Sequence, residues 1–278
     1  MDKEKLKTIL TKIANNNYEL SNEFDYNEIT NSMLDNIGDT DPVLRDELIY
    51  MVMANWIVND IYNKDELKEI LNICLDKDHL FYQIDGKKSD SVFTRTFSAL
   101  QIAVLINKDS ELDFLSEREF NKIADLVCKY YEKENDLRGY VENKGWAHSA
   151  AHGADIFVEI ANNEKVQSQT LKDILKVISK KIKVDDYIYF NNEDERIAKA
   201  VKVIINTNKL KDQYISKWFN NITDINQISF RIKKDTLIFN IKNFLRSLYF
   251  QTLDKENMDE KYILNITNSL KNLNEIRF

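Results

Sequence analysis

The sequence predicts an all-α protein made of stacked αα-hairpins that form a curved, superhelical (solenoid-like) domain. Its 278 residues include only five glycines and one proline, too few for a barrel or sandwich, which needs turn residues about every 8–12 positions. Apolar residues recur at three- and four-residue spacing along the whole chain, as in amphipathic helices. Roughly a dozen such segments joined by short links are typical of stacked helical hairpins.

The elements of the first half follow from apolar stripes and helix-start signals. Stripes predict two helices over residues 6–13 and 29–37. Asp41 and Pro42 then start a helix to about residue 62, because proline is tolerated at the first helical position. This helix is apolar nearly all round, so we expect it to be central. A helix over 63–76 follows, and then one that Asp90 or Ser91 caps and that carries apolar residues from Val92 to Leu105. The capping box of Ser116 and Glu119 starts another helix, to about residue 134.

In the second half we expect a helix from Trp146 onward and five more, over 169–183, 193–207, 210–220, 235–252 and 258–273. The run 187–190 could be extended.

We expect one domain over 1–278, with two lobes as the alternative. Residues 1–163 hold 18 Lys and Arg against 31 Asp and Glu, whereas residues 164–278 hold 21 against 15. The acidic lobe would therefore be 1–163 and the basic lobe 164–278. An anionic partner for the basic part is the functional interpretation of this asymmetry, and a pair of complementary solvated lobes is the structural alternative.

Residues 136–155 concentrate three glycines, two histidines and a tryptophan, which favours a functional site. On a helix, at about 100° per residue, His148, His152, Asp155 and Glu159 would form one polar line with apolar residues on both sides. A polar line with apolar edges indicates a groove rather than an open surface. Trp146 is a candidate for the wall of a ligand pocket.

The spacing of the two histidines also allows a metal site. His148 and His152 are four residues apart, and Asp155 could complete three ligands for a divalent metal such as zinc, manganese or iron, leaving one position open. Asp136 or Glu159 would then act as general base. The alternative is structural: the histidines would bond to groups of neighbouring helices.

Arginine is rare here, with 31 lysines against 8 arginines, so it should be retained where a planar guanidinium is needed. The candidates for anion recognition lie beside carboxylates or on an apolar face: Arg45 with Asp46, Arg138 with Asp136, Arg196, and Arg95 on an otherwise apolar helix. The alternative is that these arginines form buried ion pairs between helices; for Arg95 we expect a polar pocket or a carboxylate pair.

Several stretches resemble a known family. They are Leu44-Arg45-Asp46, the run 93–100, Asp136-Leu137-Arg138-Gly139-Tyr140, the run 145–155 (GWAHSAAHGAD) and Glu195-Arg196. Together they are similar to a bacterial domain family of unknown function, over about residues 40–250. Thr96 stands where the family pattern has serine. The resemblance implies an all-helical, soluble bacterial protein and transfers no activity.

The function we expect is a binding or interaction module whose His/Arg/Asp groove receives a small anionic or polar ligand or a peptide. A metal-dependent hydrolase and a helical adaptor with a purely structural polar line are the alternatives, and whether the protein is an enzyme stays open. No glycine-rich phosphate loop is present, so an ordinary nucleotide-binding fold is not expected. Nucleic acid is not an expected partner. No apolar run approaches the roughly 18 residues of a membrane span, and two isolated cysteines fit a cytoplasmic protein.

Overall fold

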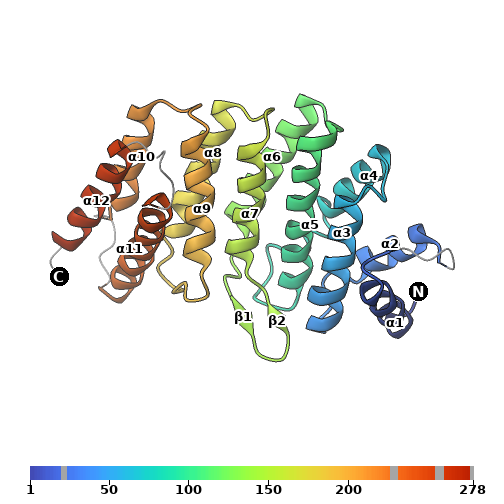
Figure 1. Cartoon of the computed structure of the whole chain (residues 1–278). Helices are drawn as coiled ribbons and strands as arrows, with labels where there is room; N and C mark the ends of the chain where they lie inside the picture. Colours follow the sequence, from blue (N-terminus) through green and yellow to red (C-terminus); the bar gives the residue numbers. More distant parts are fainter. Residues whose placement is uncertain (20–23, 226–230, 254–259, 276–278) are drawn as a thin grey trace.

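Figure 1 shows the computed structural model of the chain, which is all-α. It describes residues 1–19, 24–225, 231–253 and 260–275. The structure is 71% helical, so the predicted fold class is confirmed. Within the described residues none of the helices is both long and apolar enough to cross a membrane.

The described elements comprise twelve α-helices, one π-helix and two short strands. In chain order they are α1 Lys3–Asn15, α2 Tyr26–Asp35, π-helix η1 Val43–Tyr50, α3 Met51–Val58, α4 Lys64–Cys74, α5 Ser91–Leu112, α6 Glu117–Lys133, β1 Tyr140–Val141, β2 Gly145–Trp146, α7 Ser149–Asn162, α8 Ser168–Ile182, α9 Glu193–Asn206, α10 Asp212–Thr223, α11 Arg231–Leu253 and α12 Glu260–Glu275. The predicted start of the last helix at 258 lies outside the described residues.

The helices stack in two layers (Figure 1). In the front layer α5 packs against α7, α7 against α9, and α9 against α11. In the second layer α6 packs against α8, and α10 against α12. Each front helix is followed in the chain by a helix of the second layer, which is the stacked-hairpin arrangement that the sequence predicts.

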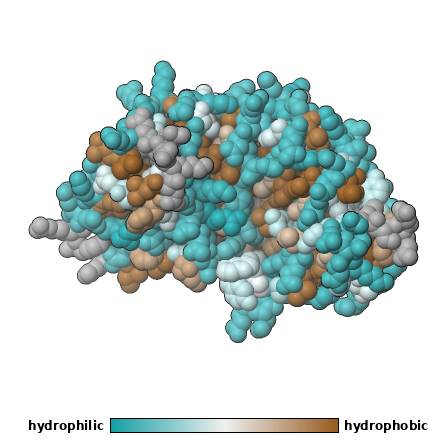
Figure 2. All heavy atoms as spheres, in the orientation of Figure 1, coloured by the Kyte–Doolittle hydropathy of each residue, from teal (hydrophilic) through white to brown (hydrophobic). Residues whose placement is uncertain are grey.

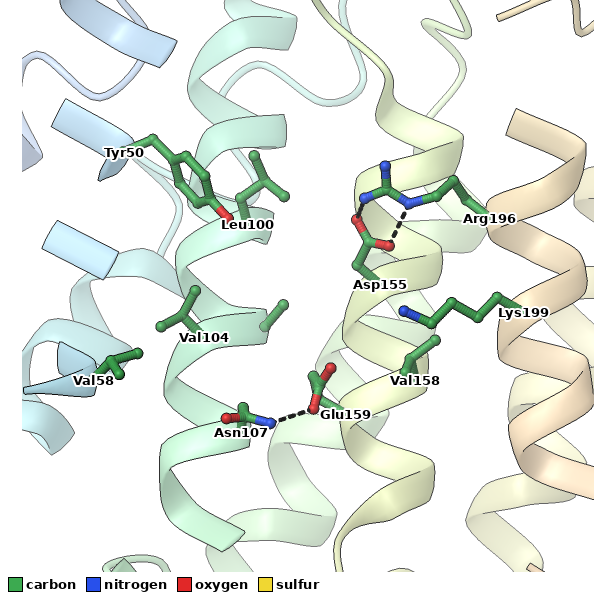
Figure 3. Close-up of a pocket in the computed structure, with 11 residues that line it drawn as sticks. Tyr50, Val58, Leu100, Val104, Asn107, Asp155, Val158, Glu159, Arg196 and Lys199 are labelled. Carbon is green, nitrogen blue, oxygen red and sulfur yellow. Dashed lines mark hydrogen bonds and ion pairs between the residues drawn. The ribbon is translucent and has the colours of Figure 1, made fainter. Parts of the chain in front are cut away.

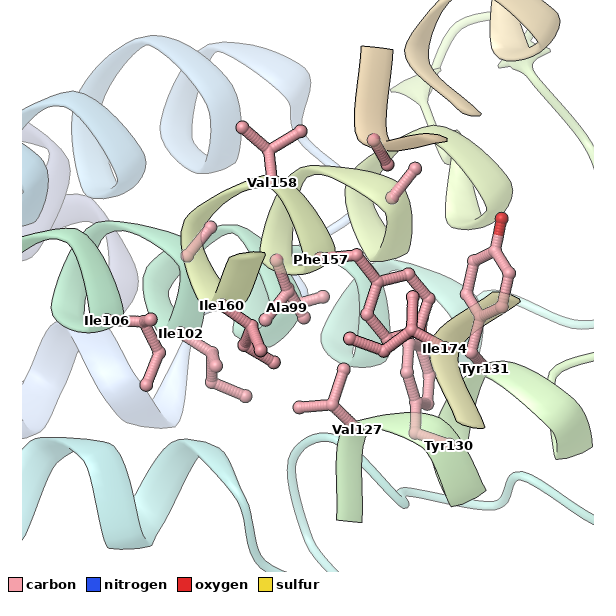
Figure 4. Packing of buried hydrophobic residues seen from close by; sticks show 14 of the residues in the cluster. Ala99, Ile102, Ile106, Val127, Tyr130, Tyr131, Phe157, Val158, Ile160 and Ile174 are labelled. Atoms are coloured by element: carbon pink, nitrogen blue, oxygen red, sulfur yellow. The ribbon is translucent and has the colours of Figure 1, made fainter. Parts of the chain in front are cut away.

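The core lies between the two layers. One cluster of buried apolar side chains includes residues from Leu6 to Leu273. Figure 4 shows its centre, where Tyr131 of α6 and Phe157 of α7 meet edge to face with ring centroids 5.0 Å apart. Burying large aromatic and branched side chains removes much apolar area from water, which stabilises the stack.

The predicted helix over 42–62 differs from the structure in two respects. Its first half is the π-helix η1, although Asp41 does cap it by accepting from the amide of Val43 at 3.0 Å. It is also not central on every side, because Val43, Met51 and Val58 are 40%, 37% and 54% exposed. One face of η1 and α3 packs into the core, and the opposite face is open to solvent. Apolar residues on every face of a helix therefore do not by themselves place it at the centre of the fold.

The predicted helix from Trp146 onward begins later than expected. Residues 140–146 form an antiparallel hairpin in which Tyr140 pairs with Trp146, and α7 begins only at Ser149. His148 precedes the helix in the left-handed conformation, with φ of 49°. Its amide donates to the carbonyl of Arg138 at 3.0 Å. This contact extends the hairpin, so the predicted placement of His148 within the helix is wrong.

The other predicted boundaries agree with the structure within a few residues. Ser116 and Glu119 form the expected capping box at α6. Asn192 precedes α9 as predicted, but its side chain makes no capping hydrogen bond. Residues 187–190 form no strand.

Candidate functional site

A groove of about 290 Å³ lies on the front face, between η1 and α3 on one side and α9 on the other, with α5 and α7 beneath it. Figure 3 shows its residues. On the face seen in Figure 2, apolar atoms gather between the positions of α3 and α5. The groove thus joins helices that are far apart in the sequence.

The floor of the groove is apolar. Leu100, Ala103 and Val104 of α5 face Val158 of α7 across it, and Val58 of α3 closes one side. The spacing of three and four residues on α5 places these side chains on one helical face. An apolar floor favours ligands with an apolar body.

One end of the groove carries the ion pair of Asp155 and Arg196. Arg196 Nε donates to Asp155 Oδ1 at 2.7 Å, and Nη2 binds the second carboxylate oxygen. Burial raises the pKa of Asp155, while the hydrogen bonds and charge of Arg196 oppose this. The third guanidinium nitrogen, Nη1, makes no hydrogen bond to any described residue, and the Arg196 side chain is 42% exposed. That nitrogen can therefore receive an acceptor from a ligand.

Lys199 and Tyr50 add polar groups to the same end. Lys199 lies one turn after Arg196 on α9, and its ammonium forms no hydrogen bond or ion pair with the described residues (Figure 3). Tyr50 points into the groove from the opposite side. Burial raises the pKa of its hydroxyl, and the charge of Asp155 adds to this, so the neutral hydroxyl is a donor or acceptor at neutral pH.

The far end of the groove is closed by a hydrogen bond between Asn107 Nδ2 and Glu159 Oε2 at 2.8 Å (Figure 3). Asp155, Val158 and Glu159 thus line the groove together, as the helical periodicity of α7 predicts. The C-terminal half of the predicted polar line is part of the groove.

The N-terminal half of that line lies outside the groove, with His148 half-buried and His152 buried. His148 stacks on Trp146, with ring centroids 4.3 Å apart, and its Nε2 lies 3.0 Å from the carbonyl oxygen of Asn191. Because a carbonyl only accepts, the ring carries its proton on Nε2. Burial lowers the pKa of His148 to about 4, so the contact of Nε2 with Glu193 at 3.6 Å is not an ion pair at neutral pH.

His152 is buried more deeply. Its ring meets Phe97 and His148 edge to face, each with centroids 5.7 Å apart. Burial lowers its pKa well below the usual value, the nearby His148 adds to this effect, and a backbone hydrogen bond with Thr96 opposes it. Neither histidine lines the groove, which therefore contains Asp155 and Glu159 of the predicted polar line without His148 and His152.

The predicted metal triad of His148, His152 and Asp155 does not form. Asp155 pairs with Arg196 of α9, and His148 lies outside α7. The helical spacing of the three residues therefore does not direct their side chains to one point. Across the described part of the chain, no group of three or more His, Cys, Asp and Glu side chains could hold a metal ion. Asp136, a candidate general base, is 3% exposed and bound by Arg138.

Arg45 and Asp46 hold the β1–β2 hairpin rather than a ligand. Arg45 is fully buried, with its guanidinium 4.2 Å from the ring centroid of Phe93 and Nη2 donating to the carbonyl of Lys144 at 2.6 Å. Its Nε lies 2.8 Å from Asp46 Oδ1, but neither atom forms a properly directed hydrogen bond. Burial lowers the pKa of Arg45 and raises that of Asp46 to about 6, so desolvation outweighs the pairing for both.

Arg95 forms the carboxylate pair that the sequence predicts. It binds Glu134 with two hydrogen bonds, from Nε at 2.5 Å and from Nη2 at 2.9 Å, and both residues are at most 3% exposed. Arg138 is engaged similarly, with Nε donating to Asp136 at 2.8 Å and Nη2 to the Ser89 carbonyl. The guanidinium groups of Arg45, Arg95 and Arg138 therefore bind carbonyls and carboxylates of the protein itself. Of the predicted arginines only Arg196 lines the groove.

Sequence reasoning missed Tyr50, Asn107 and Lys199 as groove residues. Two weak signals were present. Lys199 is one turn after Arg196, on the same face of α9, and Asn107 continues the three- and four-residue spacing of Leu100 and Val104. Nothing in the sequence shows that Tyr50 approaches them, because that depends on how η1 packs.

The fold and groove define an all-α protein of stacked helical hairpins with a mixed polar and apolar groove on one face. Residues 80–250 match the family described as "Protein of unknown function (DUF2785)". The match covers more than half of the chain, so the chain belongs to this family. It includes α5, α7 and α9, which supply most of the groove. Neither a curated protein nor a solved structure matches the chain.

Proposed function

We propose that the chain is a binding module whose front groove receives a small organic anion with an apolar body. The observation that carries the proposal is the placement of two cations, Arg196 and Lys199, beside an apolar floor, each with donor atoms that no described residue occupies. Charge-assisted hydrogen bonds to a carboxylate are about twice as strong as neutral ones.

The size of the groove limits the ligand. At about 290 Å³ it is at the lower end of the roughly 300–1,000 Å³ of typical ligand pockets. It suits a short aliphatic or branched body held against Leu100, Val104 and Val158, or the last residue of a peptide with its free carboxylate. Tyr50 and the Asn107 side chain would add neutral hydrogen bonds at the two ends.

Calorimetric titration with hexanoate and hexanamide tests the proposal, since the two probes share a body and differ in charge. We expect hexanoate to bind about tenfold more tightly, equivalent to about 1.4 kcal/mol. Lys199→Gln should remove most of that preference and leave hexanamide unaffected. Ala103→Leu, which fills the floor, should weaken both probes.

The matched control is Lys129→Gln, which neutralises an exposed lysine on α6 that makes no side-chain hydrogen bond or ion pair with the described residues. It should change neither affinity. Equal binding of hexanoate and hexanamide, or binding that survives both groove variants, would show that this groove is not an anion site.

A further inference from the structure

A second recessed surface lies between α8 and α10, two helices of the second layer (Figure 1). It consists of two adjoining hollows of about 490 and 430 Å³ that share Lys172 and Tyr214. Together they are lined by seven lysines and one acidic residue, Asp173; the lysines are Lys172, Lys176, Lys180, Lys183, Lys209, Lys211 and Lys217. We name this surface the α8–α10 basic groove. It is strongly cationic in a chain of net charge −7.

Internal contacts account for only some of these lysines. Lys180 pairs with Glu132, and Lys183 donates to the carbonyl of Asn221 at 2.5 Å. Lys209 donates to the carbonyl of Val166 at 2.9 Å.

Three other lysines are exposed and make no side-chain hydrogen bond or ion pair with the described residues: Lys176, Lys211 and Lys217. Gathering like charges without internal partners is unfavourable to folding and attracts anions.

The aromatic residues of the groove argue against nucleic acid. Trp218 is 5% exposed, and its Nε1 donates to the Leu175 carbonyl at 2.9 Å. Tyr214 is half-buried, and the ammonium of Lys172 lies 5.6 Å from its ring centroid. The described lining therefore holds no fully exposed aromatic ring for base stacking, on which single-stranded nucleic acid sites depend. The lining also holds no arginine, the residue suited to bidentate phosphate contacts.

The remaining polar groups suit a peptide. Exposed amide side chains, Gln213 and Asn221, lie along the groove, where they can bond to backbone N–H and C=O groups. Flexible lysines act as point charges and can follow carboxylates at variable spacing. Two adjoining hollows match an extended segment better than a compact ligand.

We propose that the α8–α10 basic groove binds an extended acidic segment of another protein, through Lys176, Lys211 and Lys217 to its carboxylates. The attraction is that of exposed charges, so binding is strong at low ionic strength and falls as the Debye length shortens from about 30 Å at 0.01 M to about 3 Å at 1 M salt.

Fluorescence anisotropy of the full chain with a fluorescein-labelled peptide, in which every second residue is glutamate, tests this inference. A peptide with glutamine at those positions is the neutral probe. We expect the acidic peptide to bind and the neutral one not to bind. The triple variant Lys176→Gln, Lys211→Gln, Lys217→Gln should bind about tenfold more weakly, which is about 1.4 kcal/mol.

The matched control neutralises three exposed lysines of α1 and α4, at the other end of the stack (Figure 1), that also make no side-chain hydrogen bond or ion pair with the described residues: Lys5→Gln, Lys12→Gln and Lys64→Gln. It changes the net charge equally and should keep the wild-type affinity. Equal weakening by both triple variants would show that only net charge matters and would overturn the proposal.

Two further experiments test whether the groove binds nucleic acid or a second copy of the chain instead. Tighter binding of a labelled single-stranded RNA, lost in the groove variant, would assign the groove to nucleic acid instead. Sedimentation showing self-association that the groove variant abolishes would assign it to the acidic part of a second copy. Absence of acidic-peptide binding by the wild type at low salt would likewise overturn the proposal.

Discussion

The ion pair of Arg95 and Glu134 gives the sharpest test of how the helices are held together. Arg95 on α5 binds both oxygens of Glu134, the residue that follows α6, and its Nη1 also donates to the Tyr82 carbonyl at 2.9 Å and to the Ser91 hydroxyl at 2.8 Å. Burial lowers the pKa of Arg95, but the hydrogen bonds and charge of Glu134 outweigh this and raise it overall. The Arg95 guanidinium therefore carries its charge at neutral pH.

Arg95→Ala should destabilise the protein by about 3–5 kcal/mol, the usual cost of leaving one member of a buried pair without its partner. The structure supports the full figure because Glu134 is 2% exposed and water cannot replace the guanidinium. Such a loss is a large share of the roughly 5–15 kcal/mol by which domains are stable. Urea unfolding followed by circular dichroism measures it.

A double variant separates the buried charge from lost packing. Arg95→Met with Glu134→Gln removes both charges of the pair. The new amide oxygen can still accept from the backbone N–H of Asp136, which in the wild type donates to Glu134 at 2.9 Å. The double variant should be less destabilised than Arg95→Ala. The control Arg118→Ala removes an exposed arginine and should change stability by less than about 0.5 kcal/mol. Wild-type stability in Arg95→Ala would refute the reasoning.

Three other predictions follow from burial. The ring protons of His148 should titrate in NMR near the lowered pKa of about 4. The free energy of unfolding should fall by up to about 3 kcal/mol from pH 6.5 to 4, because the unfolded chain binds a proton in this range and the folded ring does not. An NMR midpoint near 6.5 would contradict this. Gly153→Ala would place Cβ 2.4 Å from the ring of Tyr131, so denaturant unfolding should show a loss of about 1–3 kcal/mol, reduced when Tyr131→Leu is added. Burial raises the pKa of Cys74 and Cys128, the latter to about 12, so a thiol reagent at pH 8 should label both slowly in the folded protein and rapidly in urea; fast labelling of the folded chain would show that the thiols are accessible.

The contact of Arg95 with a carboxylate was predictable because local sequence limits its choices. A lone arginine on an otherwise buried helical face must find an acceptor, since an unpaired buried charge is too costly. The sequence could not identify Glu134 as that acceptor. This pairing depends on α5 lying against the end of α6, and helix packing is decided by side-chain shape over the whole interface.

The histidines show where periodicity misleads. Placing His148 and His152 on one helical face assumed that the helix began at Trp146, but the hairpin contacts of His148 delay it to Ser149. The His148 ring is also held by the carbonyl of Asn191, 43 residues later in the chain, so its placement depends on tertiary contacts. No local rule reveals them, because His148 in the left-handed conformation is tolerated only when the surroundings hold it there.

The sequence by itself determined the fold class, the stripes that form the core and the polar face of α7. These depend on composition and on the 3.6-residue repeat, which act within one segment. Only the tertiary structure decided that Asp155 and Arg196 open onto a groove while His152 and Arg45 are buried. Whether a polar side chain meets solvent or a neighbour depends on which helices stack beside it, and that follows from complementary packing between segments far apart in the chain.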